Sequence, residues 1–109
     1  MNIVDIHAER PLKGYTIYSV AKAGLAAATR SLAVELAPRV RVNGVAPGAI
    51  AWPEDGQFPD AERERIIATT PLARLGSPDD IARAVHFLAC APYVTGQVLA
   101  VDGGRSIFI

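Results

Sequence analysis

The sequence has little cysteine and no excess of either charge, and each shortage excludes a class of protein. Its 109 residues include a single cysteine, Cys90, which cannot form an internal disulfide or supply a cysteine cage for a metal. The 11 basic residues balance 11 acidic ones, so the formal net charge is zero. A protein that neutralises nucleic-acid phosphates needs a basic surface, so we expect no nucleic-acid partner.

Long apolar runs are also missing. No stretch approaches the roughly 20 apolar residues that a membrane-spanning helix needs, and the first residues lack the basic and apolar segments of a signal peptide. Hydrophobic residues still make up 50% of the chain, which excludes a disordered protein. We therefore expect a globular, cytoplasmic protein with no membrane partner, and the length allows one modest domain.

Strands and helices are expected to alternate along the chain. Three apolar segments predict strands: 1–6, 40–45 and 98–101. Apolar residues recur every three or four positions over 16–36, which predicts a helix that ends before Pro38. Shorter helices are expected at 60–69 and after Ser77, whose spacing to an aspartate forms a capping box. Helical crossovers join parallel strands, so the order predicts an α/β layered sheet.

Tyr18 and Lys22 lie four residues apart in the expected long helix, so they share one face. A free tyrosine has a pKa of about 10, and a nearby ammonium lowers it by favouring the phenolate. A tyrosine tuned in this way can donate a proton to an oxygen or nitrogen while a hydride reaches the adjacent carbon. The alternative is a chance spacing with a solvated lysine.

Two expected strand ends bring further residues to the same crevice. Asp5 ends the first strand, and Pro47-Gly48 ends the second. Open α/β sheets bind ligands at the carboxyl ends of their strands, so these residues are expected to converge with Tyr18. The alternatives are a carboxylate that caps a loop and a simple turn.

A family resemblance follows from these motifs taken together. The segments that carry it are Tyr18-Ser19-Val20-Ala21-Lys22, Val42-Asn43-Gly44-Val45-Ala46-Pro47-Gly48, Thr95-Gly96 and Val101-Asp102-Gly103-Gly104. They resemble the C-terminal half of a short-chain dehydrogenase/reductase, over nearly all of residues 1–109. The resemblance implies that 1–109 is the C-terminal portion of one such domain. Its fold would be the later part of a Rossmann-type, doubly wound parallel sheet, incomplete without the N-terminal cofactor-binding half.

The resemblance also implies NAD(P)-dependent hydride transfer. Tyr18 would be the proton donor, and Lys22 would bind the nicotinamide ribose and lower the Tyr18 pKa. The backbone of four residues would position the nicotinamide carboxamide: Pro47, Gly48, Ala49 and Ile50. Ala51 stands where many members carry a hydroxyl residue, so no side-chain contact to the cofactor is expected there.

Asp5 departs from the family pattern. It lies thirteen residues before Tyr18, where most members place a serine that polarises a carbonyl. A carboxylate repels a developing oxyanion but suits the N–H groups of a nitrogen heterocycle. With the segments 14–18, 47–54 and 102–106, it resembles bacterial pteridine reductases. That resemblance implies NADPH as the donor and a dihydropterin or dihydrofolate substrate contacted by Asp5, Tyr18 and Trp52. A loop anchor on the core is the alternative for Trp52.

The glycine-rich phosphate turn, Gly-x-Gly-x-x-Gly, does not occur in the sequence. That turn brings backbone N–H groups to a pyrophosphate at a helix N-terminus. We therefore expect a truncated chain that holds the proton-transfer half of the site. Two alternatives stay open: a family member acting on another carbonyl substrate, and an inactive fragment that only associates with partner chains. The family further implies a homo-oligomer, a tetramer, with the small residues of 16–36 as one contact.

Other candidate residues predict no chemistry. His7 and His86 have no partner at a metal or triad spacing, so no metal is expected. Cys90 is expected to be a small buried residue. Arg63 and Arg65 alternate with glutamates, which is typical of a solvated helix face.

Overall fold

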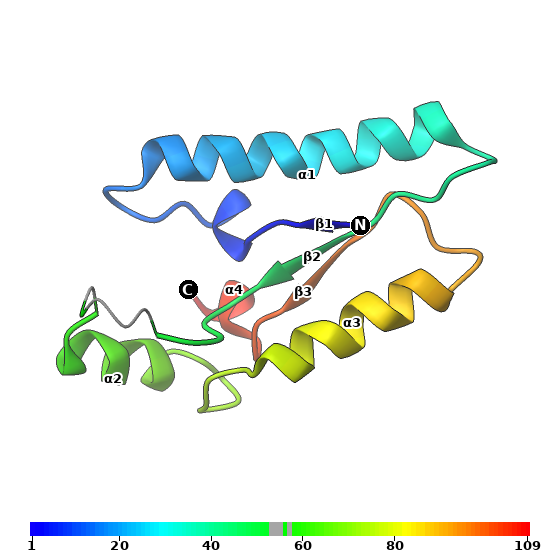
Figure 1. Cartoon of the computed structure of the whole chain (residues 1–109). Coiled ribbons are helices and arrows are strands. Elements are labelled where there is room, and N and C mark those ends of the chain that lie inside the picture. Colours follow the sequence, from blue (N-terminus) through cyan, green and yellow to red (C-terminus); the bar gives the residue numbers. More distant parts are fainter. Residues whose placement is uncertain (53–55, 57) are drawn as a thin grey trace.

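The computed structural model describes residues 1–52, 56 and 58–109 (Figure 1). Three parallel strands form one sheet in the order β1-β2-β3. Their bounds are Asn2–Ile3 for β1, Gly44–Pro47 for β2 and Val98–Val101 for β3. Gly44 of the central strand lies opposite Asn2 on one side and Val98 on the other. The predicted parallel α/β sheet is confirmed.

Two helices cover the sheet from opposite sides (Figure 1). The long helix α1 (Thr16–Leu36) has the predicted bounds and buries Ala26, Thr29 and Ala33. Helix α3 (Pro78–Cys90) contacts β2 and β3. No helix in the described part of the chain is long and apolar enough to cross a membrane.

The predicted capping box begins α3. Ser77 Oγ accepts a hydrogen bond from the Asp80 amide at 3.2 Å, and Asp80 Oδ2 accepts one from the Ser77 amide at 2.9 Å. Pro78 occupies the first helical position, where its missing N–H costs nothing. These contacts satisfy orphan amides at the helix start and fix where the chain turns from the sheet edge into α3.

Three short helices gather at the carboxyl ends of the strands (Figure 1). The 3-10 helix η1 (Ile6–Ala8) follows β1, α2 (Asp60–Ala68) follows β2, and α4 (Arg105–Phe108) follows β3. Only α2 was expected. The predicted 1–6 strand ends early because the Asp5 carboxylate accepts the His7 amide and starts η1.

The predicted 40–45 strand is displaced toward the C-terminus in the structure. Before Gly44, side chains form hydrogen bonds with backbone groups of this segment and of the loop that precedes β3. Val42 N donates to Thr95 Oγ1 at 3.1 Å, and the Asn43 amide group bonds to Val94 O and Gln97 N. The ladder therefore begins at Gly44, where an added Cβ would lie 3.1 Å from Val4 Cγ2. This shift carries the strand end to Pro47, beside the ends of the other two strands.

Candidate active site

Tyr18 and Asp5 are in direct contact at the carboxyl edge of the sheet. Tyr18 Oη donates to Asp5 Oδ2 at 2.7 Å, and Asp5 Oδ1 accepts the His7 amide at 2.8 Å. The start of η1 therefore fixes the carboxylate, while the first turn of α1 brings in the phenol. The convergence predicted for these two residues is present in the structure.

The Tyr18 pKa is raised rather than lowered. Partial burial of the phenol raises it most, and the hydrogen bond and negative charge of Asp5 add to this, to about 12. Lys22 acts at longer range, because its Nζ lies 5.9 Å from the Tyr18 ring centroid. The predicted lowering of the Tyr18 pKa is thus wrong for this structure, and the phenol is protonated at neutral pH.

Lys22 lies on the same side of the sheet edge as Tyr18. Its Nζ donates one hydrogen bond, to the Ile3 carbonyl oxygen at 3.0 Å. An ammonium group has three donors, so two N–H groups have no hydrogen-bond partner among the residues the structure describes. This side chain can therefore bind hydroxyl oxygens of a ligand beside Tyr18.

The segment after β2 forms the next wall of the site. Gly48 N donates to Val101 O at 3.0 Å, and Ala49 O accepts from Gly76 N. Any Cβ at position 48 would lie 2.7 Å from Asp102 Cβ, so only glycine fits there. Across the described residues, the amides of Ala49 and Ile50 have no hydrogen-bond partner. These donors and Lys22 fit the nicotinamide end of a dinucleotide.

A cavity of about 330 Å³ opens beside Tyr18 and Asp5, with Trp52 in its wall. Trp52 packs against Phe58 with ring centroids 5.8 Å apart. The Arg63 guanidinium lies 5.4 Å from the Trp52 ring centroid and donates to Phe58 O at 2.8 Å. Arg63 is therefore half-buried against an aromatic pair, and the prediction of a solvated face is wrong for it. The substrate role of Trp52 stays a prediction.

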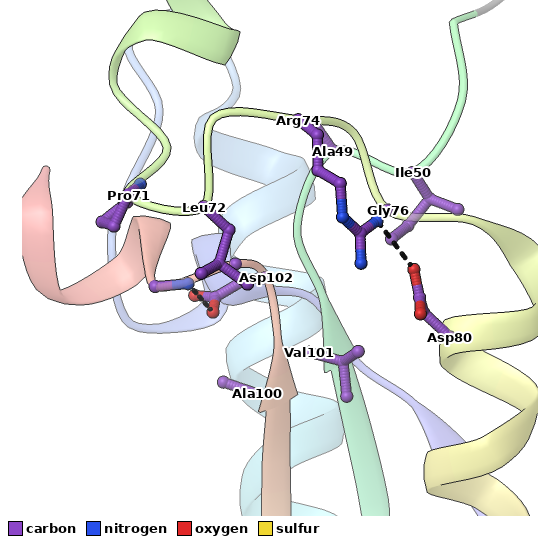
Figure 2. Close-up of a pocket in the computed structure, with 12 residues that line it drawn as sticks. Ala49, Ile50, Pro71, Leu72, Arg74, Gly76, Asp80, Ala100, Val101 and Asp102 are labelled. Atoms are coloured by element: carbon purple, nitrogen blue, oxygen red, sulfur yellow. Dashed lines mark hydrogen bonds and ion pairs between the residues drawn. The ribbon is translucent and has the colours of Figure 1, made fainter.

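A second cavity, of about 480 Å³, shares Ala49 and Ile50 with the first. Figure 2 shows its charged groups turned toward partners within the cavity. Arg74 Nη1 lies 3.2 Å from Asp80 Oδ2, and Asp102 Oδ1 accepts the Gly104 amide at 2.9 Å. Hydrogen bonds from Ser77 and Arg74 lower the pKa of Asp80. The 48–50 segment thus separates a cavity whose charges are paired from the one that holds Tyr18.

Sequence reasoning missed Arg105, which lines the first cavity and is 6% exposed. The available signal was a charged residue directly after a Gly-Gly turn. The expectation for Cys90 is also wrong, because its side chain is exposed at the end of α3 and its Sγ lies 3.7 Å from His86 Nε2. The described residues contain no group of three or more potential metal ligands.

Comparisons with known proteins show which oxidoreductases the chain is similar to. Residues 1–106 match a family described as "Enoyl-(Acyl carrier protein) reductase". A 3-oxoacyl-(acyl-carrier-protein) reductase, FabG, from Thermotoga maritima is 45% identical over 97 residues, which are 86% of this chain and 39% of that protein. Pteridine reductase 1 from Leishmania tarentolae is 43% identical over 112 residues, covering 98% of this chain and 38% of that protein.

The solved structures agree with the predicted fold. A short-chain dehydrogenase/reductase of the glucose/ribitol dehydrogenase type from Brucella melitensis superposes with a TM-score of 0.82 at 35% identity. The match covers 94% of this chain and 41% of that structure. It confirms the predicted Rossmann-type α/β fold, and the chain spans less than half the length of each of these relatives. Identity to the ketoacyl-type and pteridine reductases is nearly equal, so it favours neither substrate.

Proposed function

Because this chain belongs to the short-chain dehydrogenase/reductase family, we propose that it carries the proton-transfer half of an NADPH-dependent reductase of dihydropterin or dihydrofolate. The observation that carries the proposal is the contact between the Asp5 carboxylate and the Tyr18 phenol in the cavity wall. Family membership supports an oxidoreductase, and the carboxylate at position 5 supports the choice of substrate. The cytoplasmic location belongs to the same proposal.

NADPH, when bound, would supply a hydride to the substrate. Lys22 and the backbone of 47–50 would hold its nicotinamide ribose and carboxamide. Tyr18 would donate the proton from Oη to the nitrogen of the C=N bond that is reduced. A phenol whose pKa is about 12 is fully protonated at neutral pH, so the proton is in place before the reaction.

The Asp5 carboxylate favours a nitrogen heterocycle over a carbonyl. It accepts hydrogen bonds only, so it can hold ring N–H or amino groups of a pterin. An oxyanion that formed at the same place would meet a negative charge held by the His7 amide. A carbonyl substrate is the second candidate, because a 3-oxoacyl reductase and a pteridine reductase are almost equally identical to this chain.

We also propose that the protein assembles as a homo-oligomer, a tetramer by family resemblance. The outer face of α1 supports this, because it exposes Ile17 and Val20 beside the small residues Ala21 and Gly24. Exposed apolar groups flanking small residues allow close approach of a second helix. Sedimentation of the protein with Val20→Glu tests this surface, since the added charge should yield monomers.

The test of the proposed reaction measures NADPH oxidation with dihydropterin and with a 3-oxoacyl thioester as substrates. It uses the chain together with any in-frame sequence that precedes Met1. We expect a higher kcat/KM for dihydropterin, and Asp5→Ser should lower it by about tenfold or more, roughly 1.4 kcal/mol. NADPH affinity should stay within about twofold, because Asp5 faces the substrate.

Asp79→Ser is the matched control, because Asp79 is an exposed carboxylate on α3 whose partner is Arg83. It should leave the kcat/KM for dihydropterin unchanged. Equal turnover of the parent protein and Asp5→Ser, or a preference for the thioester in the parent, would overturn the pterin proposal.

A further inference from the structure

Arg105 carries a positive charge that the fold buries without an acidic partner. Its Nη1 donates to the carbonyl oxygen of Ile66 at 3.0 Å and to the hydroxyl oxygen of Thr69. Both acceptors are neutral, and no ion pair within the described part of the chain includes Arg105. Burying a charge without a counter-charge is costly, so an anion bound here would recover free energy.

Two donors of the guanidinium are unused. Nε and Nη2 of Arg105 have no hydrogen-bond partner in the residues that the structure describes. Neither is completely buried, because Ser19 Oγ is the one fully buried unpaired side-chain atom found among those residues, although Arg105 as a whole is only 6% exposed. The open space beside Arg105 is the cavity that it lines with Tyr18. Nε and Nη2 form a parallel fork that matches the two oxygens of a carboxylate.

The other charged residues of the cavity form no ion pair with Arg105. Glu62 and Arg65 pair with each other, with Oε1 and Nη2 2.6 Å apart. Asp5 is held by Tyr18 and the His7 amide. Burial and, after it, the charge of Arg65 lower the Arg105 pKa, and they outweigh the opposite effect of the Glu62 and Asp102 charges. The cavity therefore offers a carboxylate acceptor at Asp5 and an unmatched cation at Arg105.

The turn before α4 holds Arg105 in place. Asp102 accepts the Gly104 amide through Oδ1 and the Ser106 amide through Oδ2, at 2.9 and 2.8 Å. Gly103 and Gly104 take φ angles of 63° and 87°, which side chains disfavour. The turn directs Arg105 under α2, where Ile66 and Thr69 fix Nη1. Such a prearranged donor loses little freedom when a ligand binds.

We propose that Arg105 is a specificity-determining residue that binds a carboxylate of the substrate, while Asp5, which lines the same cavity, receives an N–H group. The ligand class is an aromatic or heteroaromatic ring that carries a carboxylate. The carboxylate site rests on the proposed function only where it chooses between the two proposed substrates. There, Arg105 favours dihydrofolate, which carries carboxylates, over an uncharged dihydropterin.

Trp52 offers a direct readout, because it is the single tryptophan of the sequence and lines the same cavity. The probes are benzoate and benzamide, which share the ring and differ in charge. Titrating each against Trp52 fluorescence at constant ionic strength should give benzoate about tenfold tighter binding, as a charge-assisted hydrogen bond predicts. Arg105→Gln should remove this preference.

Arg74→Gln is the matched control, since it removes the same charge from an exposed residue outside this cavity. It should keep the preference for benzoate. Arg105→Lys retains the charge without the fork, so it should retain part of the preference even if Arg105→Gln unfolds. Equal binding of benzoate and benzamide by the parent chain, or an unchanged preference in both Arg105 variants, would overturn the proposal. No pterin or NADPH is used, so failure here leaves the proposed reaction to its own test.

Discussion

The Tyr18 phenol donates a hydrogen bond to Asp5 Oδ2 at 2.7 Å, whereas the Lys22 ammonium lies 5.9 Å from the centroid of the same ring. Coulombic interactions weaken with distance, and a hydrogen bond adds to the nearer one. Among the charged groups, the Asp5 carboxylate therefore raises the Tyr18 pKa, and it adds to the larger effect of burial. A site built from Tyr-x-x-x-Lys alone would have the opposite balance.

Removing the Asp5 charge is expected to lower the Tyr18 pKa. In the parent chain Asp5 stabilises the protonated phenol, and the pKa lies at about 12. Asp5→Asn keeps the shape but removes the negative charge, so Tyr18 should ionise at a lower pH, toward its ordinary value of 10.0. Tyrosinate absorbance during an alkaline titration measures this once Tyr15→Phe and Tyr93→Phe remove the other two phenols.

Asp79→Asn in the same double-Phe background is the control, because Asp79 pairs with Arg83 on an exposed face. It should leave the Tyr18 titration where it was. A Tyr18 pKa that rose, or stayed at about 12, in Asp5→Asn would contradict the assigned cause.

Local chemistry made parts of the fold predictable from the sequence. The α1 bounds followed from apolar spacing and from Pro38, and the start of α3 followed from its capping box. The proximity of Asp5 and Tyr18 was predicted from the rule that open α/β sheets bind ligands at the carboxyl ends of their strands. These features depend on neighbours in sequence or on a general property of parallel sheets.

Features that depend on particular long-range contacts could not be predicted in this way. The start of β2 moved because Thr95, far along the chain, accepts the Val42 amide. In the sequence, Arg105 was only one residue of the 102–106 segment that carries the family resemblance, with no role of its own. Its burial depends on acceptors in Ile66 and Thr69, which are 39 and 36 residues away. The Tyr18 pKa was predicted with the wrong sign because the burial of the phenol and its hydrogen bond to Asp5 were not known.

The 109-residue chain alone is expected to bind NADPH more weakly than micromolar affinity, or not at all. Lys22 and the amides after β2 fit the nicotinamide end, but the sequence has no glycine-rich turn for the pyrophosphate. Calorimetric titration of the chain measures this, and the nicotinamide mononucleotide is the matched ligand. Both should bind weakly and similarly, because the parts that distinguish them have no receptor here. Micromolar binding of NADPH would contradict this.

The capping box of α3 should contribute measurably to stability. Ser77→Ala removes the hydroxyl that accepts the Asp80 amide, and losing an N-cap of this kind costs about 1 kcal/mol. Urea unfolding followed by circular dichroism measures the free energy of unfolding. Ser31→Ala, an exposed site inside α1, is the control and should be neutral or slightly stabilising. Equal effects of the two variants would show that the cap contributes nothing.

Gly103→Ala is expected to disturb both stability and the position of Arg105. The alanine would have to adopt a φ of 63°, and its Cβ would lie 2.8 Å from Thr70 Cγ2. The left-handed conformation costs about 1–2 kcal/mol and the clash about 1–3 kcal/mol more. Gly14→Ala separates these costs, because Gly14 has a φ of 87° with nothing within 4 Å of the added Cβ. In urea unfolding, Gly14→Ala should lower the free energy of unfolding only by the cost of the left-handed conformation.

Gly103→Ala should also weaken the preference of the cavity for benzoate over benzamide, whereas Gly14→Ala should not. If Gly103→Ala were no less stable than Gly14→Ala and bound benzoate as the parent does, the turn would not be what positions Arg105.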